Sequence, residues 1–179
     1  ADNIRQMGNK LLARRIARHC GIATIPGSEK VHTFQEAIGM AEKISFPVFI
    51  KAAAGGGGRG MKIANNQQEL EMAFDTLSAE VQASFGDGTL YVERYITNAR
   101  HIEVQVLGDQ FGHVIHLWER DCSVQRRYQK MIEEAPSPAL SQTLREKICE
   151  AAVAIAMKIG YQSAGTVEFI LDQDSGDFY

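Results

Sequence analysis

The segment with the clearest chemical potential is a run of glycines that follows a short apolar stretch ending in lysine. It reads "FPVFIKAAAGGGGRGMKIA", so Lys51 precedes four consecutive glycines and Arg59 follows them. Because glycine has no Cβ atom, backbone N–H groups there can approach phosphate oxygens, and a nearby lysine or arginine supplies positive charge. The pattern predicts a glycine-rich lid over the phosphates of a nucleotide. A flexible surface loop is the plainer alternative.

Two familiar nucleotide motifs do not fit this segment. The spacing Gly55-x-Gly57-x-x-Gly60 matches the dinucleotide fingerprint, but that fingerprint needs a helix at its third glycine, whereas "MKIA" favours a strand. The Walker pattern fails because Met-Lys follows the last glycine in place of Lys-Ser or Lys-Thr. What remains is a glycine-rich hairpin beside a strand lysine, a combination that protein kinases also use for phosphates.

Other polar side chains could bind a ligand or a metal, and each also has a plainer interpretation. Glu168 lies within the apolar run "GTVEFIL", where alternation alone would turn it toward solvent. His101 and Glu103 alternate with an apolar residue and could form the wet face of a sheet. Lys130 could belong to an ordinary charged surface. Cys122 has no basic partner assignable from sequence that would make it a nucleophile.

Four helices are expected from apolar spacing and capping residues. The first covers "GNKLLARRIARHCGI" and closes at Gly21. The second and third begin at the capping boxes Thr33-x-x-Glu36 and Asn66-x-x-Glu69. The stripe of the third is Leu70, Phe74, Leu77 and Val81, and the fourth runs from Leu144 to Ile159 and is capped by Gly160.

Strands are expected at 47–52, 61–64 and 89–96, at 100–107 with its hairpin partner 114–121, and at 165–172. The polar stretch 123–139, "SVQRRYQKMIEEAPSPA", is predicted to be a loop. Helices and strands alternate early and hairpins dominate later, which predicts an α+β fold.

Composition excludes several classes of protein. The 179 residues are 45% hydrophobic and 23% charged, with a formal net charge of −3, which is typical of a globular protein and gives no electrostatic footprint for nucleic acid. No apolar run is long enough to span a bilayer. Three cysteines without paired spacing argue against a disulfide scaffold or a zinc site, and the expected setting is the cytoplasm, or an organelle matrix if a transit peptide has been removed. The chain begins and ends inside element patterns, so we expect a fragment of a longer protein.

Three long segments together resemble a known family. They are "IKAAAGGGGRGMKIA", "YVERYITNARHIEVQVLGDQFGHVIHLWERDCSVQRRYQKMIEEAPSP" and "AGTVEFILD". In order, and almost without gaps, they resemble the biotin carboxylase component of biotin-dependent carboxylases, which belongs to the ATP-grasp superfamily. The family includes acetyl-, propionyl- and methylcrotonyl-CoA carboxylases and pyruvate carboxylase.

The resemblance implies an ATP-grasp fragment. Residues 1–24 would be a linker helix region, 25–95 the lid with the glycine-rich loop, and 96–179 the first part of the central domain. The family binds ATP between lid and central domain. Lys10 and Lys51 match lysines that contact its phosphates. The matching lid positions are Gly56, Gly57, Gly58, Gly60 and Met61.

Further roles are implied in the hinge and the central domain. Positions that match nucleotide contacts are Glu93, Arg94, Ile96, His101 and Gln125. Lys130 matches the catalytic lysine beside the γ-phosphate and bicarbonate, and Glu168 matches one of two carboxylates that hold Mg²⁺, with Mn²⁺ as the other candidate ion. Tyr128 stands where the family usually has histidine and sometimes asparagine, so a nucleotide contact there is not implied.

The activity implied is carboxylation of biotin on a carrier protein, with MgATP and bicarbonate as the other reactants. A biotin carboxyl carrier, a carboxyltransferase component and a homo-oligomer of the full-length protein are the partners implied; neither nucleic acid nor a membrane is among them. Because the second metal carboxylate is expected beyond Tyr179, we expect the isolated chain to be inactive. Alternatives are another ATP-grasp ligase, of the carbamoyl phosphate synthase type, and a nucleotide-binding regulatory module without turnover.

Overall fold

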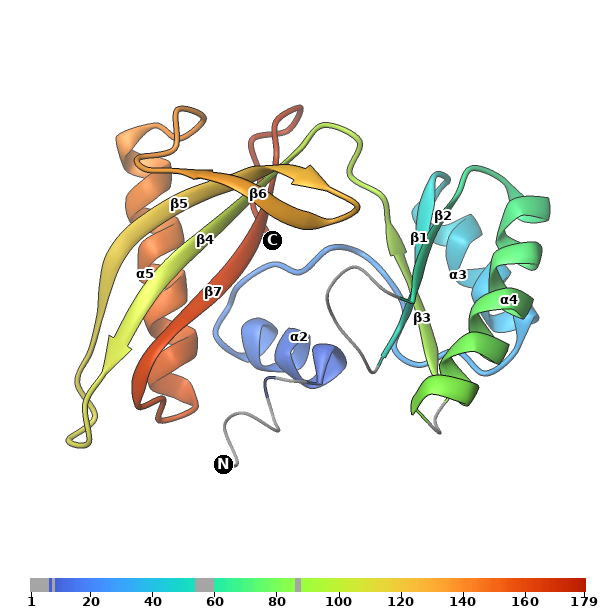
Figure 1. Ribbon diagram of the computed structural model, residues 1–179, viewed down its shortest axis with the longest axis horizontal. Helices are drawn as coiled ribbons and strands as arrows, with labels where there is room; N and C mark the ends of the chain where they lie inside the picture. The colour runs from blue at the N-terminus through green and yellow to red at the C-terminus, as the bar shows by residue number, and fades with distance from the viewer. Residues whose placement is uncertain (1–6, 8, 54–59, 86–87) are drawn as a thin grey trace. The chain divides into compact units, whose positions relative to one another are not determined.

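The computed structural model describes residues 7, 9–53, 60–85 and 88–179, and these form two compact units (Figure 1). The small unit consists of Met7–Ala13 and Ile25–Ile96, and the described part of the large unit consists of Arg14–Thr24 and Thr97–Tyr179. Helix α2, Lys10–His19, is therefore shared between the units. Among the described residues, no helix is long and apolar enough to cross a membrane. The lid and central-domain roles assigned to 25–95 and 96–179 stay predictions.

The small unit is a three-stranded antiparallel sheet with two helices packed on one face (Figure 1). Its strands are β1 (Val48–Ala52), β2 (Met61–Ala64) and β3 (Leu90–Arg94), in the order β2-β1-β3. The helices are α3 (Phe34–Ile44) and α4 (Gln67–Phe85). Alternate β1 residues point to the helices and are buried, which leaves Phe49 and Lys51 on the opposite face.

Both helices of the small unit begin at the predicted capping residues. In α3 the Glu36 N–H donates to Thr33 Oγ1 at 3.2 Å, and the Thr33 N–H donates back to Glu36 Oε2 at 3.4 Å. In α4 the Glu69 N–H donates to Asn66 Oδ1 at 2.9 Å. The predicted apolar stripe of α4 lies in the core, with Leu70, Leu77 and Val81 buried and Phe74 partly buried. Reciprocal caps and a one-sided stripe are local signals, which is why sequence located these helices.

The large unit is a four-stranded antiparallel sheet whose order is β6-β5-β4-β7. Its strands are β4 (Ala99–Gly108), β5 (Val114–Arg126), β6 (Gln129–Glu134) and β7 (Ser163–Asp172). Helix α5 (Gln142–Lys158) packs on one face, over β4 and β5 (Figure 1). Its core contains Ile102, Val104 and Val106 of β4 with Ile148 and Phe169. Alternation then places His101, Glu103 and Glu168 on the face away from α5.

The prediction that residues 123–139 form a loop is wrong for their first part. Strand β5 continues to Arg126, and β6 pairs with it antiparallel. The two strands are joined at Arg127 and Tyr128, whose φ angles are 52° and 62°. Two-residue hairpin turns with positive φ are normally read from Asn-Gly or Asp-Gly, so an Arg-Tyr turn gave no signal.

Candidate functional site

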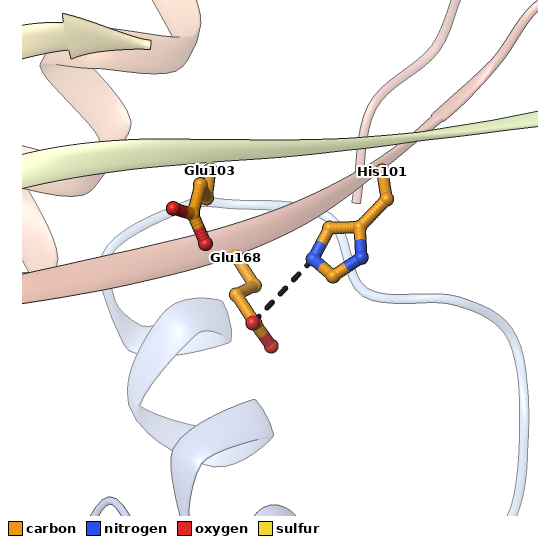
Figure 2. Close-up of side chains that lie close together, drawn as sticks. All are labelled: His101, Glu103 and Glu168. Carbon is orange, nitrogen blue, oxygen red and sulfur yellow. Dashed lines mark ion pairs between the residues drawn. The ribbon is translucent and has the colours of Figure 1, made fainter. Parts of the chain in front are cut away.

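A cluster of charged side chains lies on the sheet face away from α5. Glu103 of β4 and Glu168 of β7 are directly opposite in the strand register, and His101 lies two residues before Glu103 (Figure 2). Two carboxylates facing each other across neighbouring strands repel, so such a pair needs compensating cations. We call His101, Glu103, Glu168 and the cations described next, Arg120 and Lys130, the carboxylate cluster.

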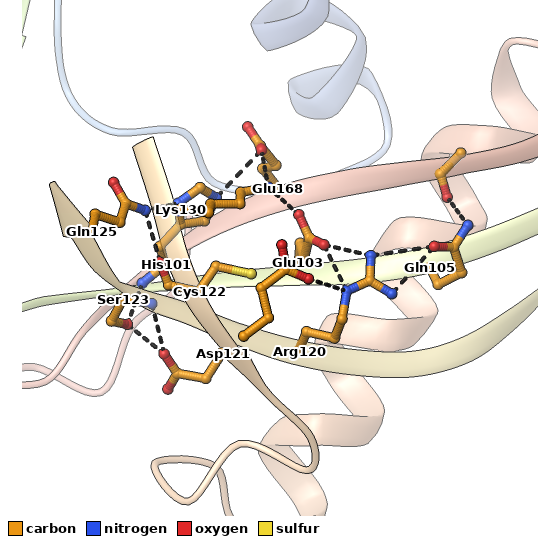
Figure 3. A network of polar contacts seen from close by, with 12 residues as sticks. His101, Glu103, Gln105, Arg120, Asp121, Cys122, Ser123, Gln125, Lys130 and Glu168 are labelled. Carbon is orange, nitrogen blue, oxygen red and sulfur yellow. Dashed lines mark hydrogen bonds and ion pairs between the residues drawn. The ribbon is translucent and has the colours of Figure 1, made fainter. Parts of the chain in front are cut away.

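Lys130 connects the two carboxylates. It forms an ion pair with Glu103 Oε2, and its Nζ lies 2.8 Å from Glu168 Oε1 (Figure 3). Because β5 lies between β6 and β4, the lysine reaches over one strand to make these contacts. Burial alone would lower the pKa of Lys130, but hydrogen bonds to Glu103 and then Glu168 raise it well above the usual lysine range. Lys130 is therefore a fixed ammonium cation.

Arg120 of β5 neutralises the other side of Glu103. Its Nε donates to Glu103 Oε1 at 2.7 Å, and its Nη1 donates to Gln105 Oε1 at 3.2 Å. Gln105 is itself held by Gly165, whose carbonyl accepts from Gln105 Nε2 at 2.9 Å. The Glu103 side chain is only 4% exposed. Burial would raise the pKa of Glu103, but the bonds from Lys130 and Arg120 outweigh it and lower that pKa.

His101 is oriented by Gln125 toward Glu168. Gln125 Nε2 donates to His101 Nδ1 at 2.6 Å and to the Cys122 carbonyl at 2.8 Å. Because Nδ1 accepts this hydrogen bond, it carries no proton, and the ring N–H is on Nε2, which lies 3.5 Å from Glu168 Oε1. This imidazole, with Lys130 as a further contributor, lowers the pKa of Glu168 to about 2. Glu168 is ionised throughout the physiological range.

The donor set fits an oxygen-seeking divalent cation at Glu168. His101, Glu103 and Glu168 each offer an atom within 4.8 Å of the others. Both Glu103 oxygens already accept from Arg120 or Lys130, so Glu168, whose side chain is 56% exposed, has the more accessible carboxylate. Mg²⁺ is usually held by one or two carboxylates together with substrate phosphates. A second group contains Cys122, but burial raises the pKa of that thiol to about 11, so it stays protonated and is a poor ligand.

The small unit carries a second cationic site. Lys51 of β1 forms an ion pair with Glu93 of β3, and its Nζ lies 4.4 Å from the centroid of the Phe49 ring. Lys10 is half-buried nearby: burial and then the charge of Lys51 lower its pKa, while Glu93 acts in the opposite sense. Two lysines that repel each other beside one carboxylate form a site that an anion would stabilise.

The structure describes some of the remaining predicted residues. Gly60 has a φ of 69°, and Met61 is paired with Lys51 across β1 and β2. Arg94 is exposed at the end of β3 and Ile96 is buried. The other predicted lid positions, Gly56, Gly57 and Gly58, lie outside the described residues. Tyr128, where the family usually has histidine, is 48% exposed in the β5–β6 turn.

Two residues of the carboxylate cluster had no predicted role. Alternation in the sequence suggests that Glu103 lies on the wet face of a sheet, yet it is buried between Lys130 and Arg120. Arg120 belongs to the quoted segment "ERDCSVQRR" and stands opposite Glu103 in the β4–β5 register. An acid facing a base across a predicted hairpin was the available signal, because cross-strand pairs of opposite charge are favourable.

Comparison with known proteins gives a consistent result. The model of the family described as carbamoyl-phosphate synthase L chain, ATP binding domain, matches residues 9–179. A biotin carboxylase of Nostoc sp. is 51% identical over 179 residues, which are 99% of this chain and 40% of that protein. The chain thus spans about two fifths of the length of this relative.

Two solved structures have closely similar folds. The complex of biotin carboxylase with β,γ-ATP from Campylobacter jejuni superposes with a TM-score of 0.94 at 47% identity, over 98% of this chain and 40% of that one. The biotin carboxylase domain of Hydrogenobacter thermophilus 2-oxoglutarate carboxylase, in complex with MgADP, ADP and bicarbonate, has a TM-score of 0.94 at 46% identity, over 99% of this chain and 39% of that one. The α+β, ATP-grasp prediction is confirmed.

Proposed function

The chain belongs to the family of the carbamoyl-phosphate synthase L chain ATP-binding domain, and on that basis we propose that it is the ATP-binding portion of a biotin carboxylase. The observation that carries the proposal is the position of Lys130, an ammonium cation held between the carboxylates of Glu103 and Glu168. The reaction proposed is MgATP-dependent carboxylation of biotin, through attack of bicarbonate on the γ-phosphate to give carboxyphosphate.

Each side chain has a proposed task in that reaction. Lys130 would offset the negative charge that develops as bicarbonate meets the γ-phosphate. Glu168, ionised and accessible, would hold Mg²⁺, which supplies charge neutralisation at the phosphate oxygens when bound. His101 and Gln125 would orient Glu168 and contact the nucleotide. Lys10 and Lys51 would bind phosphate oxygens. Lys51 would exchange its ion pair with Glu93 for a phosphate oxygen when the nucleotide binds.

The relatives favour this reaction over that of a carbamoyl phosphate synthase. The family description names that enzyme, but the relative at 51% identity and both solved neighbours are named as biotin carboxylases or as a biotin carboxylase domain. The proposal includes a biotin carboxyl carrier and a carboxyltransferase as partners, a homo-oligomeric full-length protein and a cytoplasmic location. The carboxyltransferase, and not this chain, would select the molecule that finally accepts the carboxyl group.

Calorimetric titration with MgATP tests the nucleotide site of the small unit. We expect binding that Lys51→Ala weakens by about 10-fold, since a lost charge-assisted bond costs about 1.5 kcal/mol or more. Lys62→Ala is the matched control, because Lys62 pairs with Ile50 and so belongs to the other face of the same sheet. NAD is the ligand control. Equal weakening by both substitutions, or tighter binding of NAD than of MgATP, would contradict the proposal.

A further inference from the structure

A chain of hydrogen bonds runs from a buried aspartate to the backbone of His101. Asp121 is 3% exposed, and its Oδ1 accepts from the Ser123 N–H at 3.0 Å and from Ser123 Oγ at 2.5 Å. Its Oδ2 accepts from Ser137 Oγ at 3.0 Å and lies 3.6 Å from Arg100 Nη1. Every partner of this carboxylate is a donor, so its orientation is fixed from two sides.

Ser123 transmits that orientation to β4. Its hydroxyl proton goes to Asp121, so the same oxygen is available as an acceptor, and the His101 N–H donates to it at 3.0 Å (Figure 3). The regular pairing of β4 with β5 ends at Ile102, which lies opposite Asp121. The register of β5 against β6 also shifts between Asp121 and Val124. At this irregular position the serine side chain supplies the acceptor that a regular ladder would take from backbone.

We propose that Asp121 and Ser123 are positioning residues that hold His101 in the orientation in which its Nε2 faces Glu168. His101 is then held at two points, its backbone N–H by Ser123 and its ring Nδ1 by Gln125, so that Ser123 sets where the ring starts from β4 and Gln125 sets how the ring is turned. Chained hydrogen bonds reinforce each other, so the bond from Ser123 to Asp121 strengthens the bond that Ser123 accepts from the His101 N–H. The expected effect on the affinity for MgATP rests on the proposed function, whereas the expected effect on the orientation of His101 does not.

Two readouts on the 179-residue chain test the proposal. Long-range ¹H–¹⁵N spectra of histidine, assigned with His101→Gln, report the imidazole tautomer, and calorimetry reports the dissociation constant of MgATP. The variants are Ser123→Ala, Ser123→Thr, which keeps the hydroxyl, and Asp121→Asn, which keeps the shape. Ser141→Ala is the matched control: it removes a serine whose Oγ caps α5 by accepting from the Leu144 N–H at 3.3 Å, away from His101.

We expect wild type and Ser141→Ala to show the His101 tautomer whose ring N–H is on Nε2. Ser123→Ala and Asp121→Asn should give a mixture of tautomers and bind MgATP about 10-fold more weakly, as is usual when a residue that orients a metal ligand is lost. Ser123→Thr should restore both properties. An unchanged tautomer in Ser123→Ala would overturn the positioning role. A changed tautomer with unchanged MgATP affinity would overturn its link to the nucleotide, and failure of the wild type to bind MgATP would contradict the proposed function alone.

Discussion

At the scale of single residues, the carboxylate cluster depends on Lys130. One ammonium group serves two carboxylates that face each other across β4 and β7, and Arg120 serves only one of them. The pKa of Glu168 is lowered to about 2, first by the hydrogen bond from His101 and next by the one from Lys130. Because this pKa is lower in the folded protein than the ordinary value of 4.5, ionised Glu168 stabilises the fold fully above pH 4.5. That stabilisation is lost as the pH falls from 4.5 toward about 2.

Lys130→Met should raise the pKa values of Glu103 and Glu168. The substitution removes a hydrogen bond to each carboxylate, while Arg120 still serves Glu103 and His101 still faces Glu168. ¹³C NMR of the glutamate carboxyl groups between pH 3 and pH 7 measures the change. In wild type Glu168 should show no titration step in that range, and in the variant the step should move into it. Lys147→Met, at a lysine of α5, is the control; a Glu168 that titrates alike in both variants would refute this charge balance.

At the scale of elements, the hairpin β5–β6 brings Lys130 and Gln125 to the cluster, because these two residues are paired in its register. Its turn places the non-glycine residues Arg127 and Tyr128 at positive φ. Asparagine and histidine tolerate that conformation better than tyrosine does. This preference gives a conformational reason for the residues that the family usually has at the position of Tyr128.

Tyr128→Asn should stabilise the chain by about 1 kcal/mol, because the left-handed conformation costs an ordinary L-residue about that much. Urea unfolding with the same denaturant slope for both proteins measures the difference. Tyr95→Asn is unsuitable as a control because Tyr95 packs edge-on against Phe49 with ring centroids 4.8 Å apart. Tyr128→Phe serves instead, since it keeps the ring and the positive φ and so separates the effect of the turn conformation from that of the hydroxyl. A destabilised Asn variant would mean that the phenol, not the turn, decides stability here.

Helix α5 is attached to β5 by a buried ion pair. Arg145 Nε donates to Glu119 Oε1 at 2.8 Å, and the Glu119 side chain is 0% exposed. The Ser137 N–H donates to the same oxygen at 3.0 Å, and Arg145 Nη2 donates to the Ser137 carbonyl at 3.1 Å. Burial would raise the pKa of Glu119, but Arg145 and the Ser137 N–H lower it.

Arg145→Met should therefore cost about 3 to 5 kcal/mol of unfolding free energy, because it leaves a buried carboxylate without its cation. Adding Glu119→Gln to the same protein should recover part of the loss, since glutamine is neutral and still accepts from the Ser137 N–H. Thermal and urea unfolding of the two variants measure both values. If the double variant were less stable than Arg145→Met, the unpaired charge would not be the cause.

Local signals predicted the helices, and long-range contacts escaped prediction. Capping pairs and apolar spacing lie within a few residues of each other, so α3, α4 and α5 were found from sequence. Strand β6 was not predicted because the turn before it has no glycine. The burial of Glu103 was not predicted either, because it depends on Lys130 of β6 reaching across β5. The resemblance named His101, Gln125, Lys130 and Glu168, but the contacts that join them appear only in the folded sheet.

At the scale of the whole molecule, the chain has two compact units, each with its own core and its own group of charged side chains. The small unit carries Lys10, Lys51 and Glu93, and the large unit carries the carboxylate cluster. Relatives of the same family extend well beyond the matched region, since the chain covers 40% of the Nostoc biotin carboxylase. The complete reaction is therefore a property to be measured on the full-length protein.

The most direct test measures ADP release and carboxybiotin formation by the full-length protein with MgATP and biotin, with and without bicarbonate. We expect ADP release that depends on bicarbonate and is matched by carboxybiotin formation, and we expect Lys130→Met to lose both. The isolated chain should form no carboxybiotin. ATP turnover without bicarbonate, or turnover that requires ammonia or glutamine and yields carbamoyl phosphate, would contradict the assignment as a biotin carboxylase.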